Sequence, residues 1–305
     1  MNKNVDSESL NIRKFAAIDI GSNAIRLLIT NIIEKPHSSE VQFNKNALVR
    51  LPVRLGQDVF TKGEISLKNI NRIIDTMKAF SLLMKVHQIE EYRAFATSAM
   101  REALNSHRII KQVKNQSGIN IELIDGKKEA SIISNSGLFK IINKNKTFLY
   151  VDVGGGSTEY SIFYQGQVVK SKSFKIGTVR LLNNQVDSQV FDQIKLWIVK
   201  QRQKYGSFTL IGSGGNINKI FKISGKAQDK PLSYSYLKHY DELLNSMSYQ
   251  DRITKLKLNP DRADVIVHAL KIYLKSMKWS RSSQIIVPKI GLSDGMIKSM
   301  YFNEI

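Results

Sequence analysis

The chain has 305 residues, 42% of them hydrophobic, and a formal net charge of +20 from 46 lysines and arginines against 26 acids. It contains no cysteine, which excludes disulfides, thiolate metal ligands and cysteine nucleophiles. This length and apolar content predict one large or two medium hydrophobic cores, and the positive charge predicts attraction of a polyanion.

The same data disfavour several classes of protein. No apolar run approaches the length of a membrane span, and residues 1–14 lack an apolar signal core, so we expect a soluble cytoplasmic protein without membrane insertion. The five histidines show no paired metal-ligand spacing, so any metal should be held by oxygen atoms. No zinc-finger or aromatic RNA-binding signature occurs, and we expect no specific recognition of nucleic acid.

The first informative segment lies near the N-terminus. An apolar stretch contains Asp19, reaches the turn Gly21-Ser-Asn23 and continues into a second apolar stretch. We expect a β-hairpin of strands 15–20 and 24–33, followed by a third strand at 41–51. Asp19 therefore stands just before a glycine turn that follows a strand.

Further along the chain, a strand leads into a second candidate anion site. The apolar spacing of residues 66–86 predicts a helix with Ser66 as its N-cap. A strand at 92–96 then opens into a helix that begins near Thr97. Because a helix N-terminus after a strand suits an anion, Arg101 one turn later can grip phosphate. The alternative is a surface arginine on an amphipathic helix.

Glu129 is the next candidate. A strand at 119–124 runs into Asp125-Gly-Lys-Lys-Glu-Ala130, and residues 131–142 are expected to be helical. Glu129 should then lie at or within the first helical turn. It either complements the helix dipole there, which is the commoner role, or serves as a general base.

The segment from Tyr150 to Tyr160 reads Tyr-Val-Asp-Val-Gly-Gly-Gly-Ser-Thr-Glu-Tyr. Its three glycines have no Cβ, so backbone N–H groups there can approach an anion closely. Two hydroxyl residues follow them, and Asp152 and Glu159 stand at either end to hold a cation or a water beside the anion. The alternative is an ordinary hairpin with a glycine-rich turn.

This segment repeats the N-terminal one. Asp19 corresponds to Asp152, and the two acids stand 133 residues apart, near the length of a compact domain. We therefore expect a duplicated architecture in which two phosphate-binding loops face each other across a cleft between two lobes.

The rest of the chain predicts further alternation of strands and helices. We expect a break at Gly166, a strand at 173–176, a helix at 191–204 and a third strand that enters a glycine turn at 208–216. Residues 251–279 should be mainly helical, 285–287 should form a strand, and Gly291-Leu-Ser-Asp-Gly295 should lead into a final helix. No low-complexity linker occurs, so short connections near residue 124 should join the lobes.

Six motifs together carry a resemblance to a known family. They are Ala17-Ile-Asp-Ile-Gly-Ser-Asn23, Thr97 through Arg101, Gly126-Lys-Lys-Glu-Ala130, Val151-Asp-Val-Gly-Gly-Gly-Ser-Thr-Glu159, Gly212-Ser-Gly-Gly215 and Gly291-Leu-Ser-Asp-Gly295. In this order and spacing the chain resembles the short two-domain form of the exopolyphosphatase and guanosine pentaphosphate phosphohydrolase family (Ppx/GppA). The resemblance implies two ribonuclease-H-like α/β lobes of the actin-like, sugar-kinase-like ATPase superfamily. It places one lobe at residues 1–124, joined by the C-terminal helix 294–305, and the other at residues 125–293.

The resemblance also implies roles for single residues. Glu129 matches the base that activates water. Glu159 matches the acid that closes the second loop, with a catalytic and a metal-binding role, and Asp152 and Asp19 match the loop acids near Mg²⁺ or Mn²⁺. The phosphate-contacting positions are matched by Gly21, Ser22, Asn23, Arg101, Gly154, Gly155, Gly156, Ser157 and Thr158. Phosphoryl transfer needs a positioned water, neutralised oxygens and a base, which such a set supplies.

These residues predict a metal-dependent hydrolase that releases terminal orthophosphate from inorganic polyphosphate. The alternatives are a guanosine pentaphosphate 5′-phosphohydrolase, a catalytically weak polyphosphate- or nucleotide-binding regulator, and a basic nucleic-acid-binding module. A kinase is less favoured, since no acceptor-sugar signature is evident. The oligomeric state is left open, a homodimer included.

Charge raises two further expectations. The family often has acids where this chain has Lys127 and Lys128, which leaves the pKa of Glu129 and the substrate preference open. If the positive charge serves a polyanion, part of it should line the cleft. We expect this of Arg101 and of some members of a second set, namely Arg50, Arg54, Lys127, Lys128 and Arg180.

Overall fold

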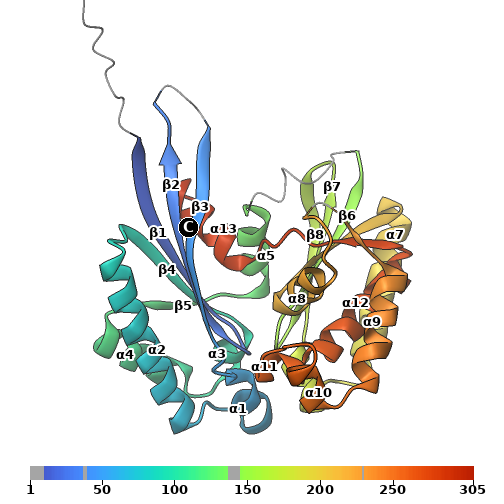
Figure 1. Ribbon diagram of the computed structural model, residues 1–305, viewed down its shortest axis with the longest axis horizontal. Helices are drawn as coiled ribbons and strands as arrows, with labels where there is room; N and C mark the ends of the chain where they lie inside the picture. Colours follow the sequence, from blue (N-terminus) through green and yellow to red (C-terminus); the bar gives the residue numbers. More distant parts are fainter. Residues whose placement is uncertain (1–9, 37–39, 137–144, 229) are drawn as a thin grey trace, which may run out of the picture.

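The computed structural model describes residues 10–36, 40–136, 145–228 and 230–305. Two mixed β-sheets stand side by side in it, each with its own helices, and two helices, α5 and α13, lie between the sheets (Figure 1). No helix in the described ranges is long and apolar enough to cross a membrane.

The first sheet has the strand order β3-β2-β1-β4-β5. Neighbours β3, β2 and β1 are antiparallel, whereas β4 and β5 continue parallel to β1. Its strands are β1 (Asn11–Ile20), β2 (Ile25–Glu34), β3 (Val41–Leu51), β4 (Glu91–Ala96) and β5 (Ile121–Leu123). The second half of β1 is buried throughout, as an apolar central strand covered on both faces should be.

The second sheet repeats this arrangement. Its order is β10-β11-β9-β6-β7-β8, with β6, β7 and β8 antiparallel and β9 and β11 parallel to β6. The strands are β6 (Thr147–Val153), β7 (Thr158–Tyr164), β8 (Gln167–Phe174), β9 (Phe208–Ser213), β10 (Leu232–Ser233) and β11 (Gln284–Ile286). The duplicated architecture expected from the two acid–glycine segments is therefore present in the strand order.

The helices of the first half are α1 (Leu55–Lys62), α2 (Leu67–Val86), α3 (Ser98–Glu102) and α4 (Ser106–Ser117). Those that follow are α5 (Gly126–Ser134), α6 (Thr178–Leu182), α7 (Val190–Tyr205), α8 (Gly215–Ile223), α9 (Tyr234–Ser246), α10 (Tyr249–Thr254), α11 (Pro260–Ala263), α12 (Ile266–Ser280) and α13 (Leu292–Tyr301). The predicted N-cap of α2 is confirmed, since the Ser66 hydroxyl accepts the Asn69 N–H at 3.4 Å. Helix α9 was not predicted.

Two predicted elements differ from the structure. The strand predicted at 173–176 is wrong: β8 starts at Gln167, because Gln165 and Gly166 both take positive φ (52° and 79°) and form a tight turn directly after β7. Helix α5 begins at Gly126 rather than residue 131, because the Asp125 carboxylate caps it, and it ends at Ser134. The predicted end of that helix, residue 142, lies outside the described residues.

Three hydrophobic cores hold the elements in place. One lies under α2 and α4 in the first half, one under α7 and α12 in the second, and a third joins the two sheets through α5 and α13. In that third core α13 passes very close to α5, so that a Cβ on Gly295 would lie 2.1 Å from the Ile132 carbonyl oxygen. Glycine is required there by space, and this contact fixes where α5, and with it Glu129, lies.

Candidate active site

The two glycine loops meet in space. The loop after β1 contains Gly21, Ser22 and Asn23, and the loop after β6 contains Gly154 to Ser157. A Cβ on Gly155 would lie 2.9 Å from the Ser22 Cβ, and one on Gly156 would lie 2.4 Å from the Phe60 ring and 2.9 Å from the Ser22 hydroxyl. None of these glycines has a positive φ, so Gly155 and Gly156 are needed for close approach to the first loop rather than for a left-handed backbone.

Several hydroxyls of these loops form hydrogen bonds within the protein. The Ser22 and Ser98 hydroxyl oxygens lie 2.9 Å apart, and the Ser157 hydroxyl donates to Glu159 Oε1 at 2.6 Å. Thr158 is fully buried and its hydroxyl donates to the Ile176 carbonyl at 2.6 Å. Any contact of Thr158 with a phosphate would therefore come from its backbone N–H.

Glu129 lies in the first turn of α5, where the sequence placed it. Burial raises the pKa of its carboxyl well above the usual value, and the charges of Glu159, Asp152 and Asp19 raise it further, while Arg101 lowers it. Four acids and one arginine from separate parts of the chain therefore lie close enough to act on one another. Asp19 and Glu159 are buried, and the other three side chains are partly buried. Such a cluster stabilises extra positive charge and disfavours further negative charge.

Each of the other acids has its own partners. Burial raises the pKa of Asp152 to about 6, against the hydrogen bonds that its Oδ2 accepts from the Ser213 hydroxyl (3.1 Å) and the Tyr150 hydroxyl (3.4 Å). Burial also raises the pKa of Glu159, although hydroxyls of Ser157 and Ser173 donate to it. The third predicted glycine turn, after β9, takes part through Ser213.

Asp19 differs from Asp152 because it already holds a cation. Arg26 Nη1 donates to Asp19 Oδ2 at 2.9 Å, while burial raises the pKa of this carboxyl. Arg26 was not predicted as a site residue, although the hairpin register pairs it with Asp19 directly across β1 and β2.

The described residues contain no group of three acidic or histidine side chains close enough to form a preassembled metal site. The donor chemistry nevertheless fits a hard divalent cation. Asp152 and Glu159 are paired across β6 and β7, and both would be relieved of repulsion by a bound cation. Mg²⁺ is commonly held by one or two carboxylates, with water and substrate phosphate completing its octahedron.

Arg101 lies where it was expected. Its charge lowers the pKa of Glu129, and its Nη1 donates to the Ile124 carbonyl at 2.6 Å. The guanidinium therefore fixes the connection between the first sheet and α5, and it keeps further N–H donors for a phosphate.

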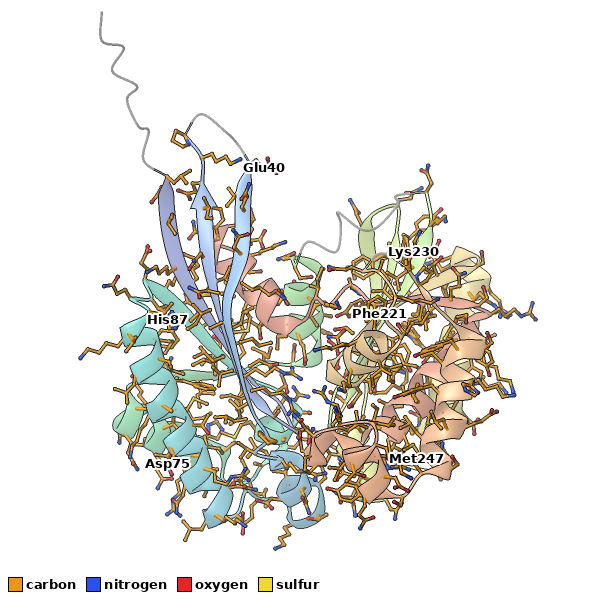
Figure 2. The ribbon with its side chains drawn as sticks, in the orientation of Figure 1. Glu40, Asp75, His87, Phe221, Lys230 and Met247 are labelled. Atoms are coloured by element: carbon orange, nitrogen blue, oxygen red, sulfur yellow. The ribbon has the colours of Figure 1, made fainter. Side chains whose placement is uncertain are left out.

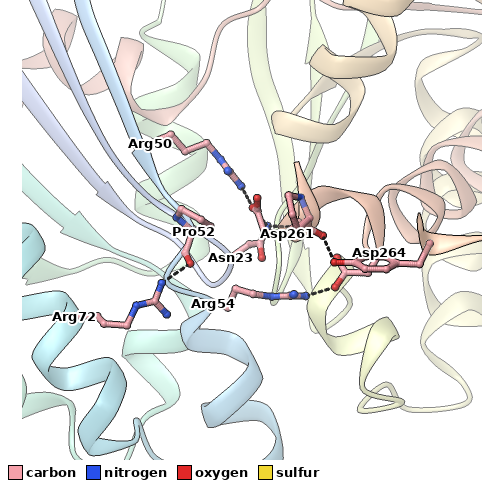
Figure 3. Close-up of polar contacts among 9 residues, drawn as sticks. Asn23, Arg50, Pro52, Arg54, Arg72, Asp261 and Asp264 are labelled. Atoms are coloured by element: carbon pink, nitrogen blue, oxygen red, sulfur yellow. Dashed lines mark hydrogen bonds and ion pairs between the residues drawn. The ribbon is translucent and has the colours of Figure 1, made fainter. Parts of the chain in front are cut away.

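Other predicted cleft cations are neutralised by acids. Arg50 pairs with Asp261 and Arg54 with Asp264 (2.7 Å), so both join the first half to α11 and its end (Figure 3). Lys128 pairs with Glu122. Arg50, Arg54 and Lys128 belong to the set of which some members were expected to line the cleft. Each is paired with an acid, which reduces the charge that it can present to a polyanion.

Arg180 is also paired within the protein. Its guanidinium donates to both Glu102 carboxylate oxygens (2.6 and 2.5 Å) and to the Gly156 carbonyl (2.7 Å), and it stacks 3.8 Å from the Phe60 ring centroid. Through the Gly156 carbonyl, Arg180 stabilises the second glycine loop. Asn23 likewise donates to the backbone and side chain of Asp261 (3.2 and 3.4 Å), which makes it part of the contact between the two halves.

A second arginine missed from the sequence is Arg262. A Cβ on Gly215 would lie 3.3 Å from Arg262 Nη2 and 3.4 Å from Arg26 Nη2, so both guanidinium groups reach the start of α8. Burial, together with the charges of Arg50 and Arg26, lowers the pKa of Arg262 to about 10. This accumulation of cations marks a second anion-attracting part of the site, beside the acids.

The model of the Ppx/GppA phosphatase family matches residues 47–304. A bifunctional 3-dehydroquinate synthase/phosphatase of Fusobacterium nucleatum is 29% identical over 89% of this chain and 44% of its own length. A guanosine-5′-triphosphate,3′-diphosphate pyrophosphatase of Photobacterium profundum is 26% identical over 94% of this chain and 59% of its own.

Exopolyphosphatase 2 of Mycobacterium tuberculosis is 32% identical over 56% of this chain and 54% of its own length. The chain thus spans about half the length of the curated relatives it matches. Among solved structures, an exopolyphosphatase from Cytophaga hutchinsonii superposes with a TM-score of 0.82 at 23% identity, over 95% of this chain and 98% of its own. An Aquifex aeolicus Ppx/GppA family member gives 0.74 at 24%, over 96% and 99%. These likenesses confirm the predicted two-lobed actin-like fold.

Proposed function

We propose that this chain, which belongs to the Ppx/GppA phosphatase family, releases terminal orthophosphate from a linear phosphate chain, with inorganic polyphosphate as substrate. The observation that carries the proposal is the partly buried Glu129, whose carboxyl lies close enough to three other acids and to Arg101 to feel their charges, next to two touching glycine loops. Phosphoryl transfer is catalysed chiefly by positioning and by electrostatic stabilisation, and this arrangement supplies both.

In the proposed reaction the terminal phosphate binds the backbone N–H groups of the two loops, at Gly21 to Asn23 and at Gly154 to Thr158. Arg101 donates to its oxygens. Glu129 accepts a proton from a water whose oxygen attacks the terminal phosphorus in line with the bridging oxygen. The bond from phosphorus to that bridging oxygen breaks, which yields orthophosphate and a chain one phosphate shorter.

Burial and the neighbouring acids raise the pKa of Glu129, which makes its carboxylate a stronger proton acceptor. Mg²⁺ or Mn²⁺, held by Asp152 and Glu159, would neutralise charge on the phosphate oxygens. We propose a smaller role for Asp19 in holding that ion, since Arg26 already pairs with it.

Guanosine pentaphosphate is the second candidate substrate. The similarity to the Photobacterium profundum pyrophosphatase, over 94% of this chain, favours it, as does the pair of arginines beside Gly215, which could receive a second phosphate group.

The test is release of orthophosphate from polyphosphate and from guanosine pentaphosphate, with Mg²⁺, by wild type and by Glu129→Gln. Glu129-dependent release from polyphosphate supports the proposal, and release from guanosine pentaphosphate alone would replace its substrate. Failure to hydrolyse either one would leave a binding protein.

A further inference from the structure

The outer face of α8 carries two lysines in line with the candidate active site. Ile217, Ile220 and Phe221 are the buried residues of this helix, and Phe221 is labelled in Figure 2. At 100° per residue, Gly215, Lys219 and Lys222 lie together on the opposite face. Lys219 is half-buried and Lys222 is exposed.

One end of this face touches the cations of the site. Gly215 packs against the guanidinium groups of Arg26 and Arg262. One turn later, the pKa of Lys219 is lowered by burial first and then by the charges of Arg262 and Lys222. A continuous row of positive charge therefore leaves the site along α8 and extends about 10 Å from Gly215 to Lys222, at the usual helical rise.

Within the described residues neither lysine forms an ion pair, although Arg50, Arg54, Lys128 and Arg180 elsewhere near the site all do. Like charges so close together disfavour one another in the empty protein, and an anionic chain laid along them would remove that cost.

We propose that Lys219 and Lys222 bind the phosphate groups that follow the one being cleaved, so that α8 guides a long polyphosphate chain away from the active site. This inference rests on the proposed function. It makes Lys219 and Lys222 the residues that set the preference of the enzyme for long polyphosphate. A nucleotide substrate would end near the arginines and would gain little from Lys222.

The test compares Lys219→Gln/Lys222→Gln with a matched control, Lys195→Gln/Lys200→Gln. Both double variants lose two positive charges from a helix, but the control lysines are exposed on α7, at the outer edge of the molecule in Figure 1, while α8 lies near its middle. Circular dichroism would establish that both variants fold. KM and kcat would be measured for long-chain polyphosphate and for tripolyphosphate at several salt concentrations.

We expect the α8 variant to raise KM for the long chain roughly tenfold, with kcat and the KM for tripolyphosphate within about twofold of wild type. The slope of log affinity against log salt should fall by about 0.7 for each lost contact, the value for a flexible single-stranded polyanion. Equal effects on long and short chains, or an equal effect of the control variant, would overturn the proposal.

Direct binding of long and short polyphosphate to wild type and both variants separates this inference from the proposed function. Wild type could fail to release phosphate and still bind polyphosphate in a chain-length-dependent way that the α8 variant loses. That result would reject the proposed activity and support binding of the chain by Lys219 and Lys222. If the α8 substitutions weaken only the binding of guanosine pentaphosphate, the two lysines bind a nucleotide and the proposal is wrong.

Discussion

Arg26 and Glu159 occupy the same place in the two repeated hairpins: Arg26 is paired with Asp19 across β1 and β2, and Glu159 with Asp152 across β6 and β7. The duplicated fold therefore gives one loop acid a permanent cation and the other an acid for a neighbour. Since like charges repel in a buried place, only the second pair gains from a divalent cation. The repeat is symmetrical in backbone and asymmetrical in charge.

This asymmetry predicts different metal behaviour of the two acids. Asp152→Asn should raise the Mg²⁺ concentration needed for half-maximal phosphate release by at least roughly tenfold, whereas Asp19→Asn should change it less, because Arg26 already neutralises Asp19. Titration of activity with Mg²⁺ after treatment with EDTA measures both. Undiminished activity in EDTA would remove the metal from the mechanism.

Glu129 is predicted to be the base. Glu129→Gln keeps the size of the side chain and should lower kcat at least about 10²-fold while polyphosphate still binds. The matched control is Glu122→Gln on β5, whose exposed carboxylate pairs with Lys128 outside the acid cluster and should leave kcat within about twofold. Near-normal turnover by Glu129→Gln would refute the assignment.

The acid cluster should cost stability when it is ionised. The folded-state pKa of Asp152 is about 6 against an ordinary 3.8, so the folded protein holds this proton more tightly than the unfolded chain does. The free energy of unfolding therefore falls as pH rises from about 4 to about 6, by up to about 3 kcal/mol for a shift of this size. Above that range it stays at the lower value.

Asp152→Asn should remove that cost. We expect it to raise the free energy of unfolding by about 1–3 kcal/mol at neutral pH. The gain should be much smaller near pH 4, where the wild-type carboxyl is protonated in the folded state and only roughly half ionised in the unfolded chain. Urea unfolding at the two pH values, without divalent cation, gives the comparison. A gain that is the same at both values would mean that the charge of Asp152 is not the cause.

The arginine–aspartate contact between the two halves, made by Arg50 and Arg54 with Asp261 and Asp264, is predicted to stabilise their packing. Its side chains are only 9–23% exposed. A double-mutant cycle of Arg54→Ala and Asp264→Ala should give a coupling energy of about 1–2 kcal/mol. The exposed pair Lys238 and Glu242, at 3.7 Å, is the control and should couple by less than about 0.5 kcal/mol. Equal coupling in the two cycles would show that the contact contributes no more than a surface pair.

The sequence by itself determined what depends on local pattern. An acid two residues before a glycine turn, repeated 133 residues apart, predicted the duplicated fold and the two loops, and the family followed from six such motifs. Glu129 was predicted at or within the first turn of the helix that follows the strand at 119–124. The cap that starts this helix was missed: the Asp125 carboxylate accepts the N–H groups of Lys127 and Lys128.

Only the tertiary structure decided which charges are free. Arg50 and Arg54 read in sequence as open cations, yet Asp261 and Asp264, 211 and 210 residues further on, neutralise them. Arg26 and Arg262 were not predicted as site residues, yet they converge on Gly215. Charge pairing acts through space over a few ångströms, and the folding of α8 and α11 against the first half brings these residues within that range. Hydrophobic period and turn chemistry specify the elements and leave such distances undetermined.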